Sequence, residues 1–190
     1  MKYLIFLLGC LISLTGCSSK TSLGYTSVIE KQQPNHISLK LQEFEDQRTD
    51  GQNIGSIRNG YGMTIIRIFT DDSIPDWVAN ALKTELTNAG YTIVSGDTPS
   101  DYSIEGKIKK LYATTYLIYH GRMSVEITLK KGQDVIFQKL YETDKDNGVN
   151  WMGQTASCAE TLKINLQEIC RRFDEDIKQA LLVPAALNPL

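Results

Sequence analysis

The sequence has little of what most enzymes and nucleic-acid-binding proteins need. Its 190 residues include only two histidines, His36 and His120, and these stand far apart. It contains no Gly-x-Ser-x-Gly nucleophile turn, no His-Glu-x-x-His zinc helix and no Cys-x-x-Cys pair. The formal net charge is -2, and no basic run is present that would neutralise nucleic-acid phosphates. We therefore expect a protein that is not an enzyme and does not bind nucleic acid.

Two short motifs that suggest a ligand also lack essential parts. In the acidic stretch that starts at Asp144, Gly148 occupies a ligand position of a calcium loop, and Thr155 stands where the bidentate glutamate is needed. Gly60-Tyr61-Gly62 has no third glycine and runs into a strand, whereas a dinucleotide site needs a helix N-terminus. We expect neither a metal nor a cofactor.

A membrane-spanning run is missing too. The apolar stretch Tyr3–Leu14 follows Lys2 and is about a dozen residues long, whereas a span needs ~20. Its length, and the small residues after it, are typical of a secretory signal. The stretch ends in Leu14-Thr15-Gly16-Cys17, which resembles the bacterial lipobox, where the cysteine is diacylated and the chain is cut before it. An ordinary signal peptide with an incidental cysteine is the alternative.

The lipobox assigns a lipid anchor to Cys17 and divides the chain. Ser18 and Ser19 follow, where aspartate would signal inner-membrane retention, so we expect anchoring at the periplasmic face of the outer membrane. Cleavage leaves 174 residues, enough for one domain. The expected division is a signal peptide at 1–16, a lipidated N-terminus and tether at 17–35, an α/β domain at 36–183 and a tail at 184–190. A short strand at Val28-Ile29, added to the domain, is the alternative within the tether.

Two further cysteines, Cys158 and Cys170, lie in a long helical pattern. On one continuous helix, 12 residues separate them by about 18 Å along the axis. A disulfide needs Cα atoms within about 7 Å, so we expect buried or partly buried thiols. If the helix begins after Cys158, a disulfide that involves these cysteines is the alternative.

Hydrophobic periodicity predicts an α+β fold, with a mixed, largely antiparallel sheet packed by two main helices. Ser73 is the expected N-cap of the first helix, and Gly90 ends it. Residues 142–150 are expected to form a loop, and a bulge is expected near Leu111. The predicted strands lie at 37–44, 54–57, 63–69, 91–94, 102–109, 112–119, 123–129 and 135–141, and the predicted helices at 74–89 and 155–182.

Several stretches resemble one family, the YajG-like outer-membrane lipoproteins. They are the lipobox at Cys17, Asp46-Gln47-Arg48-Thr49-Asp50, the junction Leu82–Val94 centred on Ala89-Gly90-Tyr91, and Ile108–Ala113. The resemblance implies a periplasmic α/β domain without catalytic residues. A Phe-x-Asp-x-Arg stretch, here Phe44–Arg48, also occurs in related lipoproteins that serve as pore components or as activators of cell-wall enzymes.

Candidate partner-binding residues fall into two groups. Asp46 and Arg48 form a charged loop suited to recognition, but a local ion pair that fixes the turn is an alternative. Tyr112, Tyr116, Tyr119 and Trp151 are candidates for an exposed aromatic patch, with half-buried sheet packing as the alternative.

The leading hypothesis is a non-enzymatic, outer-membrane-anchored lipoprotein whose domain binds another cell-envelope protein. A structural subunit of an outer-membrane secretion or assembly complex is one alternative. A hydrolase or ligand carrier acting on cell-wall or lipid material is another. A large apolar pocket or clustered titratable residues would favour the last of these, whereas a closed core with an exposed apolar patch would favour a protein partner.

Overall fold

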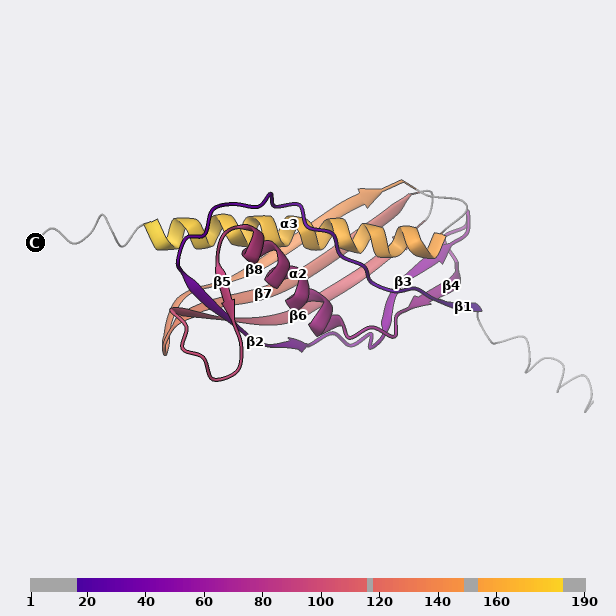
Figure 1. Cartoon of the computed structure of the whole chain (residues 1–190). Helices are drawn as coiled ribbons and strands as arrows, with labels where there is room; N and C mark the ends of the chain where they lie inside the picture. The colour runs from indigo at the N-terminus through magenta and orange to yellow at the C-terminus, as the bar shows by residue number, and fades with distance from the viewer. Residues whose placement is uncertain (1–16, 116–117, 149–153, 183–190) are drawn as a thin grey trace, which may run out of the picture.

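A computed structural model describes residues 17–115, 118–148 and 154–182. In these ranges eight strands form one sheet, and two helices lie against one of its faces (Figure 1). No helix in this part of the chain is long and apolar enough to cross a membrane. The elements are β1 (Cys17–Lys20), β2 (Ser38–Asp46), β3 (Asn53–Arg58), β4 (Thr64–Phe69), α2 (Ile74–Asn88), β5 (Thr92–Val94), β6 (Tyr102–Thr115), β7 (Tyr119–Lys131), β8 (Asp134–Asn147) and α3 (Gln154–Leu182).

β6 is the strand around which the sheet is built. β7 pairs antiparallel with nearly its whole length, and β8 pairs antiparallel with β7. The other edge of β6 is divided, because its first half pairs with β2 and its end pairs with β3, both in parallel. β5 extends the β2 side, and β4 and β1 extend the β3 side. The predicted α+β fold is confirmed, and the long β6–β7–β8 pairings make the mixed sheet largely antiparallel.

β7 shows why only one face of the sheet is covered. Met123, Val125 and Ile127 are buried, and α3 packs on this strand. Glu126 and Thr128 alternate with them and line a depression on the open face. Alternation with a period of two residues is what a sheet with one wet face requires.

The two helices follow their predicted patterns. The Ser73 hydroxyl accepts a hydrogen bond from the Asp76 amide at 3.4 Å at the start of α2. Gly90 follows the end of α2 with a φ of 93°, which glycine adopts without strain. On α3 the predicted apolar stripe is buried, with Ala159 and Leu181 partly buried at its ends. The central members of this stripe are Leu162, Leu166, Ile169, Phe173 and Ile177.

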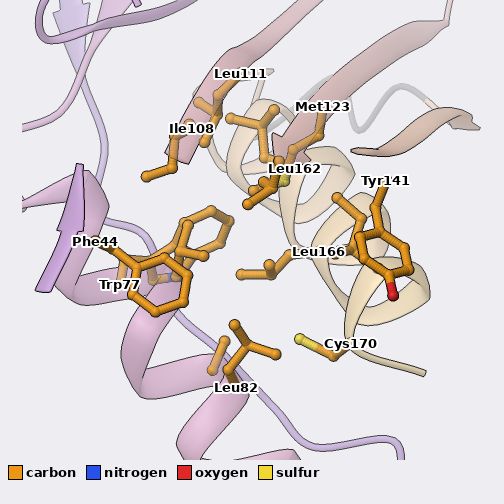
Figure 2. Close-up of a cluster of buried hydrophobic side chains, with 14 of the residues drawn as sticks. Phe44, Trp77, Leu82, Ile108, Leu111, Met123, Tyr141, Leu162, Leu166 and Cys170 are labelled. Atoms are coloured by element: carbon orange, nitrogen blue, oxygen red, sulfur yellow. The ribbon is translucent and has the colours of Figure 1, made fainter. Parts of the chain in front are cut away.

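Close approach of α3 to the sheet depends on a glycine. A Cβ atom at Gly121 of β7 would lie 2.5 Å from Cγ2 of Thr161 and 2.6 Å from Nδ2 of Asn165. Side chains from the sheet and both helices then close the core, with Leu82 of α2 and Leu166 of α3 pointing into the same cluster (Figure 2).

Two sequence-based expectations about β6–β8 differ from the structure in extent. The bulge expected near Leu111 lies between Ile108 and Lys110, where the register with β7 shifts. The prediction of a loop over 142–150 is wrong for residues 142–147, because β8 continues to Asn147. Two acidic side chains of this part of β8 pair with side chains opposite them on β7, so these acidic residues are accommodated in a strand. These pairs are Arg122–Asp144 and His120–Asp146.

The segment 17–35 is the largest departure from the sequence-based expectation. The sequence predicts a tether, but these residues lie along the domain and contribute β1 to the sheet (Figure 1). Leu23 is buried in the core. The amide of Gln32 donates to the carbonyl of Asn88, and the amide of Asn35 donates to the carbonyl of Gly90. The described chain is therefore folded onto the domain from Cys17 onward.

Candidate functional site

Cys17 is exposed at one edge of the sheet. It is the first residue of β1, which runs parallel to β4, and it lies opposite Ile66. The lipobox residues before it, Leu14–Gly16, lie outside the described residues. A group attached to Cys17 would stand at the surface of the domain, beside the β3–β4 hairpin.

Two aspartates after β4 hold the chain that leaves β1. A carboxylate oxygen of Asp71 accepts a hydrogen bond from Nζ of Lys20 at 2.7 Å. Oδ2 of Asp72 accepts from the Leu23 amide at 2.6 Å and from the Ser22 hydroxyl at 2.8 Å. The hydrogen bond from the Leu23 amide, followed by that from Ser22, lowers the pKa of Asp72 below its usual range. The charge on Asp72 is thus coupled to the position of the segment.

The main attachment is Glu85 of α2, whose side chain is buried. Its Oε1 accepts hydrogen bonds from the Tyr25 hydroxyl at 2.6 Å and the Val28 amide at 2.8 Å. Its Oε2 accepts from the Ser27 hydroxyl at 2.7 Å and the Ile29 amide at 2.9 Å. A carboxylate can be buried when its oxygens are satisfied in this way. Glu85 therefore fixes residues 25–29 to the helix.

Both helices add contacts to the same segment. The indole Nε1 of Trp77 in α2 donates to the carbonyl of Gly24 at 3.2 Å. The side-chain amide of Gln167 in α3 donates to the carbonyl of Thr26 at 2.7 Å. These bonds satisfy backbone carbonyls in a stretch where residues 21–37 form no regular secondary structure.

Sequence reasoning missed this attachment, although a signal for it is present. Glu85 stands four residues after Ala81 and immediately before Leu86, within the buried stripe of α2. A carboxylate on the apolar face of an amphipathic helix requires buried donors. The sequence does not indicate which distant segment supplies them.

The candidate residues Asp46 and Arg48 lie at the junction between β2 and β3. The guanidinium of Arg48 contacts both carboxylate oxygens of Asp46 at 2.9 Å, and only 2% of the Arg48 side chain is exposed. It also donates to the carbonyls of Gly51 at 2.6 Å, Asn53 at 3.3 Å and Leu111 at 3.3 Å. Arg48 thus joins the end of β2, the start of β3 and the middle of β6. This geometry favours the local ion pair over direct partner contact by Arg48.

Burial of Asp46 tends to raise the pKa of its carboxyl group. The hydrogen bonds and positive charge of Arg48 outweigh burial and hold that pKa below its usual range. The Asp46 carboxylate therefore remains charged at neutral pH and pairs with Arg48 at the β2–β3 junction.

Of the four aromatic candidates, the structure describes Tyr112 and Tyr119. Tyr112 is half-buried and lies opposite Arg122 in the β6–β7 ladder. Tyr119 is fully buried in the core. Tyr116 and Trp151 lie outside the described residues.

Cys158 and Cys170 are both free and buried on α3, as their spacing predicts. Burial raises the pKa of the Cys158 thiol to about 12, and it also raises the pKa of Cys170. Neither thiol is suited to nucleophilic chemistry at neutral pH.

Several open depressions lie on the described surface, and residues 135–139 of β8 help to line two of them. One, of about 530 Å³ on the open face of the sheet, is lined mainly by glutamate and lysine side chains, including the ion pair between Glu105 and Lys130. The other, of about 550 Å³, lies between β8 and the end of α3. No serine, cysteine or histidine lines either depression. Among the described residues, no three His, Cys, Asp or Glu side chains gather in a way that would hold a metal ion.

Comparison with known proteins identifies the fold rather than a family. No protein-family model matches the sequence, and no curated protein matches it. A crystal structure of a DUF330 protein from Xanthomonas campestris is similar, with a TM-score of 0.57 and 10% identity over 82% of this chain and 91% of that chain. A second crystal structure, of an uncharacterized protein, has a TM-score of 0.55 and 10% identity over 83% of this chain and 99% of that chain. At such identities these likenesses show a shared fold and no shared activity.

Proposed function

We propose that the chain is a bacterial lipoprotein that is acylated on Cys17 and held at the periplasmic face of the outer membrane. The lipobox Leu14–Cys17 supports this assignment, as does the exposed position of Cys17. The resemblance of Asp46–Asp50 and Ala89–Tyr91 to the YajG-like lipoproteins supports it further. Each buried methylene of an acyl chain contributes about 0.8 kcal/mol, so two or three chains would hold the domain at a membrane.

Palmitate labelling tests the anchor. Wild-type protein is expected to incorporate the label and to sediment with the outer membrane, and Cys17→Ala is expected to lose both properties. Because Cys17 is exposed, this change should leave the domain folded, as circular dichroism would show. Ser18→Ala is the matched control and should keep the label. Labelling that survives Cys17→Ala would refute the assignment.

The domain acts by binding another envelope protein and does not catalyse a reaction. The observation that carries this proposal is the free edge of β8, a strand of 14 residues that pairs only with β7 among the described strands. Such an edge presents unpaired backbone donors and acceptors to a partner strand. The carbonyl of Glu142 is an exception on β8, because it accepts a hydrogen bond from Arg172 of α3 at 2.9 Å. Val135, Ile136 and Leu140 on β8 are exposed and would add apolar contacts. The closed apolar core of the described residues, and the absence of serine, cysteine and histidine from the linings of the two depressions beside β8, agree with this function.

Site-specific photo-cross-linking in native membranes tests the partner. A cross-linking amino acid at Ile136 is expected to give one reproducible adduct of higher mass. The control position is Val28, which is also exposed but lies on the N-terminal segment. Equal adducts from both positions, or none from Ile136, would contradict binding at β8.

A further inference from the structure

The register of the sheet places Cys17 in a row that crosses six strands at one end of the molecule. Figure 1 shows β1, β3 and β4 together at this end. On β1 and β4, the residues after this row lie further into the sheet. On β4, the residues before Ile66 lead to the β3–β4 turn. The row consists of Cys17, Ile66, Ile57, Thr115, Tyr119 and Asn147.

The β3–β4 hairpin projects past Cys17. β1 and β4 are parallel, so the N-terminal ends of the two strands point in the same direction. Met63 precedes Ile66 by three residues, which corresponds to about 10 Å at the rise of an extended strand. Acyl chains on Cys17 would therefore enter a bilayer at the end of the domain that carries the hairpin tip.

The tip is apolar where a soluble turn is usually polar. Tyr61 is 91% exposed, Met63 60% and Ile65 47%. Ile118, beside the start of β7, is exposed at the same end of the sheet. Tyrosine and aliphatic side chains are suited to the boundary between headgroups and hydrocarbon.

The charge of the hairpin also fits a membrane surface. Residues 51–70 include Arg58 and Arg67 and no acidic residue, although the whole chain has a formal charge of -2. The acids that flank this range in the sequence, Asp50 and Asp71, lie at the base of the hairpin, away from the tip. Basic residues beside an apolar tip attract anionic lipid headgroups.

We propose that the β3–β4 hairpin tip, with Tyr61, Met63 and Ile65, is a second membrane contact that docks on the lipid surface into which Cys17 is anchored. This inference rests on the proposed acylation of Cys17. Two contacts, the inserted acyl chains of Cys17 and the apolar hairpin tip, fix the orientation of the domain on the bilayer. The opposite end of the sheet, with the β7–β8 turn, then points away from the membrane.

A fluorescent probe on the acylated full-length chain tests this contact. Met63→Cys is labelled with an environment-sensitive fluorophore, and the protein is reconstituted into vesicles of phosphatidylethanolamine and phosphatidylglycerol that carry nitroxide lipids. Cys158 and Cys170 are buried, so they should not compete for the label. Val135→Cys is the matched control, because Val135 is 54% exposed and lies next to the β7–β8 turn. We expect a blue shift and quenching at position 63 and neither at position 135.

The outcomes separate the two proposals. Protein without palmitate that fails to float with the vesicles would overturn acylation and the orientation inferred from it. Palmitoylated, vesicle-bound protein in which position 63 is quenched no more than position 135 would overturn the hairpin contact alone. With Tyr61→Ser and Ile65→Ser added to Met63→Cys, quenching is expected to fall at least roughly twofold. Leu140→Ser, an exposed change on β8, should leave it unchanged.

Discussion

The segment that follows Cys17 is attached to the domain in two different ways. Residues 17–20 form β1 at the edge of the sheet, and the ion pair between Lys20 and Asp71 there is exposed, with 68% and 76% of the two side chains accessible to solvent. Residues 25–29 are instead held by four hydrogen bonds to the buried carboxylate of Glu85. One attachment faces water and the other is closed off from it.

The difference in burial between these two attachments determines which part of the segment is held more stably on the domain. An exposed ion pair contributes ~0–1 kcal/mol, because water and salt screen it. A buried donor that loses its acceptor costs about 1–3 kcal/mol. We therefore expect β1, which lies next to the anchor, to open locally more often than residues 25–29.

Removal of Glu85 should have the largest effect on stability. Glu85→Ala leaves the hydroxyls of Tyr25 and Ser27 and the amides of Val28 and Ile29 without their acceptor. We expect a loss of about 4 kcal/mol in the free energy of unfolding, measured by urea denaturation. Hydrogen exchange should show residues 25–29 losing protection.

The matched change Glu85→Gln separates charge from shape. Its amide keeps one acceptor oxygen but turns an NH₂ group toward donors, so an intermediate loss is expected. Preserved protection of the Val28 and Ile29 amides in Glu85→Ala would show that packing, rather than Glu85, holds the segment.

Arg48 is a second buried charged side chain that binds irregular backbone. Its guanidinium donates to backbone carbonyls at the β2–β3 junction, as the carboxylate of Glu85 accepts from residues 25–29. Arg48→Ala removes hydrogen bonds to three carbonyls and to Asp46. The loss should be smaller, about 2 kcal/mol, because a quarter of the Asp46 side chain is exposed and can be hydrated. Urea denaturation measures it, and Arg48→Lys should restore little because lysine lacks the planar fork. Unchanged stability with a lost cross-linking partner would instead support the interface interpretation.

Local sequence patterns predicted the elements that depend on near neighbours. Ser73 and Gly90 bracket α2 as expected, and the alternation from Met123 to Leu129 gives β7 its covered face. The free thiols of Cys158 and Cys170 also followed from helical spacing alone. In each case the decisive geometry lies within one helix or within one hairpin.

The remaining features depend on partners far along the chain. Residues 17–35 are polar and look like a linker until Glu85, 56 to 60 residues away, is seen to accept their donors. The acidic end of β8 looks like a loop until Arg122 is seen opposite Asp144. Likewise, Asp46 and Arg48 stood out in the sequence, but only the structure shows that the guanidinium of Arg48 is buried.

Acid should weaken the hydrogen bonds of Asp72 to Ser22 and Leu23, which lie between β1 and residues 25–29. The pKa of Asp72 is lowered in the folded state by its hydrogen bonds to Leu23 and Ser22, relative to about 3.9 when unfolded. A lowered folded-state pKa means that this contribution is present above about pH 4 and is lost as pH falls through the folded value. The NMR shift of the Leu23 amide should follow this titration, and Asp72→Asn should abolish it.

The Ser38 amide provides an internal control for that titration. It donates to Asp101, whose pKa is also lowered by hydrogen bonds from Ser38. Its own acid transition should persist in Asp72→Asn. Loss of both transitions would indicate global acid unfolding rather than release of the segment at Leu23.

The smallest effect is expected where the segment faces water. Lys20→Ala removes the exposed ion pair with Asp71 and should change the free energy of unfolding by no more than about 0.5 kcal/mol. The free energy of unfolding of the variant should depend on salt no more than that of the wild type. Hydrogen exchange of β1 should be nearly the same as in the wild type, because its backbone bonds to β4 remain. A loss comparable to that in Glu85→Ala would mean that β1 is fixed as firmly as residues 25–29. The domain would then be rigid up to Cys17, and the lipid anchor would impose its orientation directly on the sheet.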